Sequence, residues 1–486
     1  MIRRARPLTT AVCGALLAGG LATAPAAGPV LQAVVLYAGP AVATPGVRVV
    51  VALPGLHAAV VRGRAGALQR LATAPGVRGL APDDPVQLTG DEDGAVGGVL
   101  ASRDLGGDAG RPLAGAGVRV AVVDTGVSDT RALDRASGRL VDAADSSGVA
   151  AGEAVSTGGR YDDGYGHGTF MAGLVAGGPV DATHGKALGV APAATVLVVR
   201  VAQPDGRTSL SQVLGGLSWV AEHADQVDVV NLSLSHARPQ NAYGADPLTD
   251  AVEQLRAAGI VVVASAGNVR GTVGDPGLDP QALTVGAADV VTHRTANFSG
   301  SGTVAGVAKP DLVASGVHLL GLLPQDSVLA RASATAVLPG GLARGSGTSQ
   351  ATAVTSGLAA LLLAAHPSAT PAQVKASLRC AAHPLPGHRD GAGLARATDE
   401  LCSGPDGEAL DGSGDLTGEA TFDASSWAAS SWAASSWAAS SWAASSWAAS
   451  SWAASSWAAS SWAASSWAAS SWAASSWAGV EPESAP

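Results

Sequence analysis

Apolar runs alternate with helix-like segments through the middle of the chain. Between Val118 and about Ala397, the near-continuous apolar segments VRVAVVD, TVLVVRV, DVVNLSL and IVVVASAGN are separated by stretches with apolar residues at helical spacing. Strands that lack polar alternation are typical of a parallel sheet covered on both faces. The pattern therefore predicts an α/β fold, a doubly wound and mostly parallel sheet with helices on both faces.

A second, smaller pattern precedes this region. Residues 57–88 read as a strand (Ala58–Val61), a short helix (Ala65–Ala72) and a further strand ending near Asp83 and Asp84. These elements predict a small α+β module in front of the main domain.

The N-terminus has the pattern of a secretory signal. Three arginines among the first six residues precede the apolar stretch Ala11–Leu21 and a run of small residues, with cleavage expected near Ala24 or Ala26. The stretch is too short to span a bilayer comfortably, so a membrane anchor or a short core helix is the weaker interpretation. No later run reaches about 18 apolar residues, and we expect no membrane span in the exported protein.

The C-terminal region is a repeat. An acidic, glycine-rich linker (403–424) leads to repeated SSWAA (425–479) and a short end (480–486). A tryptophan at every fifth position surrounds a helix and alternates between the faces of a strand, so neither form has one apolar face. A flexible stalk and a multivalent adhesive that binds cell-wall glycan, aromatic partners or another copy remain open. A pentapeptide solenoid is disfavoured because tryptophan would strain its interior.

Composition and charge narrow the function classes. Of 12 tryptophans, all but Trp219 lie in the repeat, so the main domain is poor in this residue. The formal net charge of -10 and the lack of a basic stripe argue against a nucleic-acid partner. Cys380 and Cys402 remain after the signal. In an oxidising compartment they are expected to form a disulfide worth about 3 kcal/mol, with free or buried thiols as the alternative.

Three polar residues stand where apolar elements meet small-residue turns. Asp124 ends the strand VRVAVVD, whereas His167 and Ser349 each open a helix-like segment. Strand ends and helix starts gather at one edge of a doubly wound sheet, where active sites form. A serine hydroxyl becomes a nucleophile when an imidazole takes its proton and a carboxylate orients that imidazole. Asn268, together with the backbone N–H of Ser349, is a candidate to stabilise the oxyanion.

Each of these residues also has a structural explanation. Asp124 and Asn268 suit turns, and His167 and Ser349 suit helix starts. Their joint occurrence is more specific, because DTG, GHGT, SAGN and GTSxA follow one another in that order, accompanied by GVAP, DVVNLSL, VGA and FSGSG. Over about residues 118–397 the chain resembles the subtilisin-like serine endopeptidases.

The resemblance implies a role for each motif. Asp124, His167 and Ser349 would be the catalytic triad, Asn268 the oxyanion donor, and Ser233, Leu234 and Ser235 the strand edge that pairs with an extended substrate. Phe170, Gln350 and Ala353 stand where the family usually has histidine, methionine and proline, and Val269 and Arg270 are also atypical. None of these departures removes a proton-transfer group, but they leave the substrate preference unassigned.

The segment from about Val49 to Leu88 resembles the pro-domain of this family, although its usual first strand and helix are not evident between Ala27 and Val47. Self-cleavage is expected to give a start between about Asp91 and Gly110, and a retained stabilising subdomain is the alternative. The expected organisation is a signal peptide (1–26), a pro-domain (27–100), a peptidase domain (101–402), the linker, the repeat and the C-terminal end.

No cofactor and no metal site is predicted. Calcium is common in the family, and the acidic pairs Asp162 with Asp163 and Asp275 with Asp279 are possible oxygen ligands, but solvated loops explain them equally well. The sequence thus favours a secreted serine endopeptidase with polypeptide substrates. The alternatives are a catalytically silent surface-binding protein and, less favoured, a metal-dependent hydrolase using Asp124, His167 and His184.

Overall fold

A mostly parallel sheet forms the centre of the protein in the computed structural model. Its order is β8 (Leu140–Asp145), β9 (Thr195–Arg200), β7 (Arg119–Asp124), β11 (Val229–Leu232), β13 (Val261–Ser265), β14 (Leu283–Asp289) and β18 (Leu312–Ser315), with parallel neighbours throughout. Among the strands that the structure describes, only β15 (Arg294–Thr295) pairs antiparallel within it. The predicted α/β fold is confirmed, and the four apolar runs read from the sequence are β7, β9, β11 with β12 (Leu234–Ser235), and β13.

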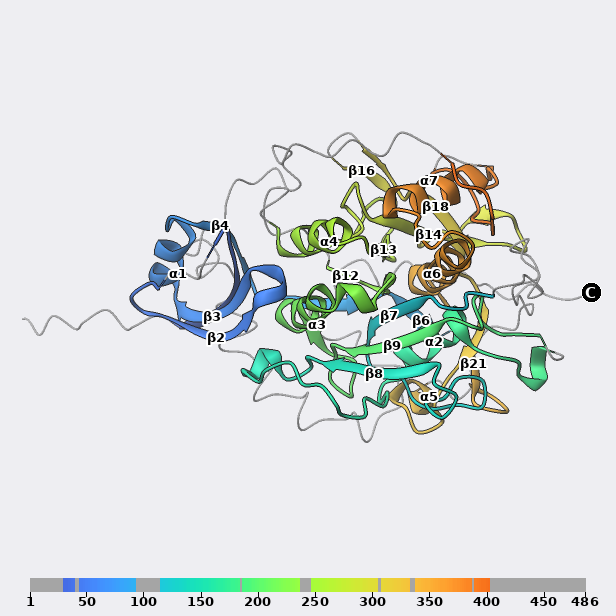
Figure 1. Cartoon of the computed structure of the whole chain (residues 1–486), viewed down its shortest axis with the longest axis horizontal. Coiled ribbons are helices and arrows are strands. Elements are labelled where there is room, and N and C mark those ends of the chain that lie inside the picture. The colour runs from blue at the N-terminus through green and yellow to red at the C-terminus, as the bar shows by residue number, and fades with distance from the viewer. Residues whose placement is uncertain are drawn as a thin grey trace, which may run out of the picture.

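Helices cover both faces of this sheet (Figure 1). On one face, α2 (His167–Ala176), α6 (Thr348–Ala365) and α7 (Pro371–Ala381) share an apolar core with the strands. On the other, α3 (Leu210–Glu222) and α4 (Pro247–Ala257) form a second core. Among the described residues α6 is the one helix long and apolar enough to cross a membrane, yet 94% of it is buried inside the domain. It is therefore a core helix.

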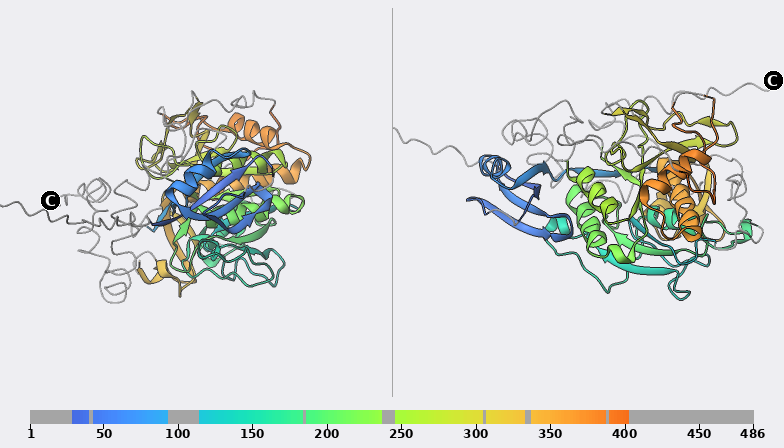
Figure 2. Two further views of the ribbon diagram at one scale, coloured as in Figure 1. Left: turned by 90° about the vertical axis from the view of Figure 1, so that its left-hand side faces the viewer. Right: turned by 45° about the horizontal axis from the view of Figure 1, so that its top comes forward.

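The N-terminal module is an antiparallel sheet with one helix. The strand order is β2 (Val47–Leu53), β3 (Ala58–Arg64), β1 (Val30–Tyr37) and β4 (Val77–Pro82), and α1 (Ala65–Ala72) covers one face. The other face packs on α3 and α4, so the blue sheet lies against the green helices (Figure 2). The sequence did not predict β1. Successive residues of β1 pack into the two different cores, so both faces of the strand bury apolar side chains. A half-exposed strand is recognised by alternating apolar and polar residues, and β1 lacks that pattern.

The chain leaving this module crosses the edge of the parallel sheet where the strands end. β5 (Pro85–Leu88) pairs with β10 (Thr208–Ser209) and with β12, and β6 (Gly90–Glu92) pairs with β21. The remaining elements are β16 (Gly302–Val304), β17 (Val307–Lys309), β19 (Leu319–Leu322), α5 (Val328–Ala332), β20 (Val337–Leu338) and β21 (Leu342–Gly347).

The structure describes residues 29–39, 43–92, 114–183, 186–236, 246–304, 307–332, 337–386 and 389–402. The predicted signal peptide, the acidic linker, the SSWAA repeat, the C-terminal end and His184 lie outside these residues. What the sequence predicts for them stays a prediction.

Candidate active site

The end of β7 and the start of α2 bring a carboxylate and an imidazole together. His167 Nδ1 lies 2.8 Å from Asp124 Oδ1 and 2.9 Å from Asp124 Oδ2, and both side chains are almost completely buried. The backbone N–H of Thr125 donates to Asp124 Oδ1 (2.8 Å). A carboxylate held in this way fixes the ring orientation of the histidine and stabilises its protonated form.

A second buried carboxylate, Asp163, orders the loop before His167. Its oxygens accept hydrogen bonds from the Thr125 hydroxyl, the Gly166 N–H, and both the N–H and hydroxyl of Thr169, at 2.7–2.8 Å. Burial raises the pKa of Asp163, and the hydrogen bonds from Gly166 and Thr169 oppose that rise. Asp163 thus links the Asp124 turn to the His167 helix and is a positioning residue. The sequence presented it only as one of an acidic pair.

Glycine beside His167 lets the two elements approach. A Cβ added to Gly168 would lie 2.1 Å from the Gly126 carbonyl oxygen and 3.2 Å from the Asp124 Cβ. Any larger residue at this position would push α2 away from the end of β7. The glycine of the GHGT motif is therefore needed for the contact between Asp124 and His167.

Ser349 and Asn268 come from other parts of the same edge. Ser349 lies in the first turn of α6, and Asn268 follows β13. The Asn268 amide is oriented by Thr348, whose N–H and hydroxyl both donate to Asn268 Oδ1 (2.9 Å each). Its Nδ2 donor and the Ser349 N–H consequently converge on one point.

The carbonyl oxygen of Thr89 occupies that point. It accepts hydrogen bonds from Asn268 Nδ2 (2.7 Å) and from the Ser349 N–H (3.2 Å). The Thr89 hydroxyl lies 2.6 Å from Ser349 Oγ, and the Ser349 hydroxyl also donates to the Ser233 carbonyl (2.9 Å). The chain's own Thr89–Gly90 peptide bond thus lies beside the nucleophile. Nothing in the local sequence around Thr89 indicated this position.

The strand predicted to bind substrate pairs with the same segment. Leu234 lies opposite Leu88 and Ser235 opposite Gln87 in antiparallel register, and the Thr89 N–H donates to the Ser233 carbonyl (3.3 Å). The structure therefore brings together Asp124 with His167, and Asn268 with Ser349 and residues 233–235, around one extended piece of chain.

One departure from the family pattern has a clear packing partner. Phe170 is fully buried on α2, and its ring lies against Gly321 of β19, where an added Cβ would be 2.4 Å from a ring carbon. Gln350 is also buried beside Ser349. Phe170 supports the helix that carries His167 and takes no part in proton transfer.

Cys380 and Cys402 are neighbours. The structure has Cys380 and Cys402 as free thiols, and a hydrogen bond with Cys380 raises the pKa of Cys402. Their proximity suits the disulfide expected from the sequence, which stays a prediction.

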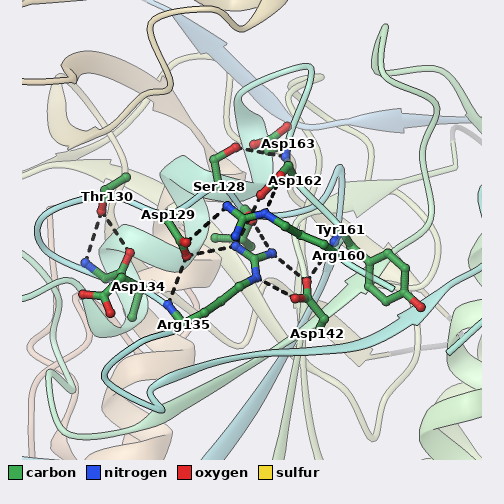
Figure 3. Close-up of polar contacts among 12 residues, drawn as sticks. Ser128, Asp129, Thr130, Asp134, Arg135, Asp142, Arg160, Tyr161, Asp162 and Asp163 are labelled. Carbon is green, nitrogen blue, oxygen red and sulfur yellow. Dashed lines mark hydrogen bonds and ion pairs between the residues drawn. The ribbon is translucent and has the colours of Figure 1, made fainter. Parts of the chain in front are cut away.

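The first acidic pair does not fit a calcium site. Asp162 pairs with Arg160 (2.7 Å) and Arg135 (3.3 Å), within a network in which Arg135 also binds Asp129 and Asp142 (Figure 3). Both oxygens of Asp163 are engaged by its own loop. Arginines already supply the positive charge that a cation would bring.

The second acidic pair is deeply buried. Burial and the neighbouring Asp246 raise the pKa of Asp275 well above its usual range, and burial together with Glu253 raises that of Asp279 to about 7. Negatively charged neighbours thus lie close to both of these buried carboxyls. Within the described ranges, no group of three or more His, Cys, Asp or Glu side chains is arranged to hold a metal.

Known proteins share this arrangement of the chain. A model of the subtilase family matches residues 115–407. Serine protease AprX of Bacillus subtilis is 34% identical over 286 residues, covering 56% of this chain and 62% of the relative. Subtilisin DY of Bacillus licheniformis is 31% identical over 270 residues, covering 54% and 82%. This chain therefore spans less than two thirds of AprX.

A solved structure supports the fold. Fervidolysin from Fervidobacterium pennivorans, a keratinolytic enzyme related to subtilisin, superposes with a TM-score of 0.57 at 23% identity, covering 77% of this chain and 61% of that protein. With the family match extending over residues 115–407, the chain belongs to the subtilase family of serine-type endopeptidases.

Proposed function

We propose that this protein is made as a precursor and acts, after export, as an endopeptidase that hydrolyses polypeptides through an acyl-enzyme. One observation carries the proposal: the Thr89 carbonyl oxygen accepts hydrogen bonds from both Asn268 and the Ser349 N–H, with the Ser349 hydroxyl beside it. The carbonyl of a peptide bond thus lies between the two proposed oxyanion donors, and this supports the proposal.

In the first half of the reaction, Ser349 Oγ bonds to the carbonyl carbon while its proton passes to His167. Asp124 stabilises the resulting imidazolium, and negative charge builds up on the carbonyl oxygen. Asn268 Nδ2 and the Ser349 N–H donate to that oxygen. The carbon–nitrogen bond then breaks, and His167 returns the proton to the leaving amine.

In the second half, a water molecule takes the place of the amine. His167 accepts its proton as the water oxygen bonds to the acyl carbon, and the ester to Ser349 breaks with the proton returned to Oγ. The same two donors stabilise the oxyanion in both halves, so removal of Asn268 affects both.

The first bond cut is proposed to be Thr89–Gly90. The chain is paired with a strand of the peptidase domain on both sides of this bond. Before the bond β5 pairs with β12, and after it β6 pairs with β21. Cleavage here gives a mature N-terminus at Gly90, one residue before the range expected from the sequence. Residues up to Thr89 would then form the pro-domain.

The catalytically silent alternative is not favoured, because the four polar groups that the reaction needs are intact and oriented by their neighbours. The metal-dependent alternative has its third residue, His184, outside the described residues. Asp124 and His167 contact each other directly, so the Asp124 carboxylate serves as a hydrogen-bond partner of the His167 ring. This use of the carboxylate does not favour a role as a metal ligand.

The test is active-site labelling of the secreted protein. A fluorophosphonate should attach to Ser349 in the processed protein, and cleavage of an unfolded protein should be insensitive to chelators. Asn268→Ala should retain the label while its kcat falls about 10²–10³-fold, because one oxyanion donor is lost. The exposed Ser137→Ala is the matched control. Failure of Ser349 to take the label would favour the silent alternative.

A further inference from the structure

The side chain of Thr89 enters the cleft beside the reacting bond. Thr89 is only 5% exposed, and its hydroxyl lies 3.0 Å from the Ser265 hydroxyl as well as 2.6 Å from that of Ser349. The residue just before the proposed cleavage point is therefore held through its side chain as well as through its backbone.

Ser265 is arranged to receive a hydroxyl. It is fully buried at the end of β13 and donates its own proton to the Leu234 carbonyl (2.9 Å). Its oxygen lone pairs are left to accept, and the Thr89 hydroxyl donates to them. A valine of the same shape would bury its methyl group against a polar oxygen and make no hydrogen bond.

Two segments of the peptidase domain, at the end of β12 and after β13, pack closely against each other. A Cβ built on Gly274 would lie 2.5 Å from Ser235 Cβ and 2.8 Å from Ser235 Oγ. Next to this contact, the backbones of His236 and Asp275 exchange hydrogen bonds of 2.7 and 3.0 Å. The β12 segment and the segment after β13 are thus joined to each other.

From these contacts we infer that the enzyme selects a small residue with a β-hydroxyl, threonine above all, immediately before the bond it cleaves. Ser265 is the specificity-determining residue for the hydroxyl, and the near-complete burial of the Thr89 side chain (5% exposed) limits the size. The inference rests on the proposed endopeptidase function and names its substrate class.

The test uses peptides that differ only at the residue before the cleaved bond: threonine, valine, alanine or phenylalanine. For the processed full-length enzyme, kcat/KM should be about three- to tenfold higher for threonine than for valine, the contribution of one hydrogen bond. Phenylalanine should be cleaved about 10- to 100-fold less efficiently than threonine, because it overfills the space.

One variant isolates the contribution of the hydroxyl. Ser265→Ala should bring the threonine-to-valine ratio close to one. Ser137→Ala should leave this ratio as in the unmodified enzyme. Enzyme concentration is taken from fluorophosphonate titration, so that each ratio refers to labelled sites.

The outcomes distinguish the two proposals. A labelled, active enzyme that prefers phenylalanine, or that keeps its threonine preference in Ser265→Ala, overturns this inference and leaves the endopeptidase function intact. An enzyme that neither takes the label nor cleaves any peptide overturns both.

Discussion

The N-terminal module contacts the peptidase domain in two different ways. Its body lays one face of a sheet on α3 and α4, an apolar contact that includes Val34, Leu36 and Leu53. Its last residues instead run as a strand past Ser349, held by backbone pairing and by the proposed oxyanion donor Asn268. The body contact is broad and independent of the catalytic residues, whereas the strand depends on them. Docking and cleavage are therefore separable by mutation.

The largest effect should come from a change where the strand runs past Ser349. Ser349→Ala removes the nucleophile, so the Thr89–Gly90 bond should stay intact, with a loss in kcat on the order of 10⁶-fold. Intact mass measurement of the secreted protein would give the uncut chain, while Ser137→Ala matures normally. A start at Gly90 in purified Ser349→Ala would mean that another enzyme makes this cut.

At the contact of the module's sheet with α3, Gly55 offers a way to weaken docking without changing the active site. Gly55 lies in a short turn (Pro54–Leu56), and a Cβ there would be 2.2 Å from the Ser218 carbonyl oxygen of α3. Gly55→Ala should force the module outward and weaken binding of the cut module about 10- to 100-fold. Because a bound module covers the active site, the delay between cleavage and the appearance of peptidase activity should shorten accordingly.

Gly66→Ala in α1 is the control for this change, because the nearest atom to its added Cβ is a terminal nitrogen of Arg70 at 3.9 Å. An unchanged lag in Gly55→Ala would show that the strand, and not the body, keeps the module bound.

Asp84 makes the junction between body and strand sensitive to pH. Burial raises its pKa to about 6, opposed by the nearby His236 and aided by Asp83. The free module exposes this carboxyl, whose pKa then returns to about 4. A raised pKa in the bound state means that binding is strongest below pH 4 and weakens as pH rises through 6.

We therefore expect the cut module to bind about tenfold more weakly at pH 7.5 than at pH 4.5. Calorimetric titration of the processed enzyme with the added module would measure this without relying on catalysis, in which His167 must accept a proton. Asp84→Asn should flatten the dependence, and a slope of the opposite sign would contradict it.

The smallest effect is expected at the ion pair of the body. Arg78 binds Asp250 of α4 with Nη2 2.9 Å from Oδ2, but the arginine is one third exposed. Arg78→Ala should lower module affinity by about two- to fivefold, and the difference should shrink in 1 M salt. A salt-independent, hundredfold loss would place the pair among the main contributors to docking.

The sequence was most informative where chemistry and local pattern coincide. Asp124 at a strand end and Ser349 at a helix start were predictable, because buried parallel strands and glycine-flanked helix starts have distinct local signatures. Strand β1 was not, because its pattern makes sense only when the module is docked and both faces are covered.

Thr89 and Asp163 were missed for a related reason. Thr89 acquires its role from Asn268, Ser265 and Ser349, which are 176 or more residues away along the chain. Asp163 reads as one acid in a polar loop, and its contact with Thr125, 38 residues earlier in the chain, is seen only in the fold. Long-range proximity of this kind leaves no mark in a single sequence.

The contact of Asp83 with α3 affects the stability of this helix after the module is removed. The Ser211 N–H and hydroxyl in the first turn of α3 both donate to Asp83 of the module (2.7 Å each), whereas the helix's own N-cap residue, Ser209, provides no side-chain cap. A carboxylate of the module thus caps the first turn of a helix that belongs to the peptidase domain. If the module is removed as proposed, Ser211 loses both of these hydrogen bonds, and we expect α3 to re-form less readily in a mature enzyme that has unfolded than in the full chain.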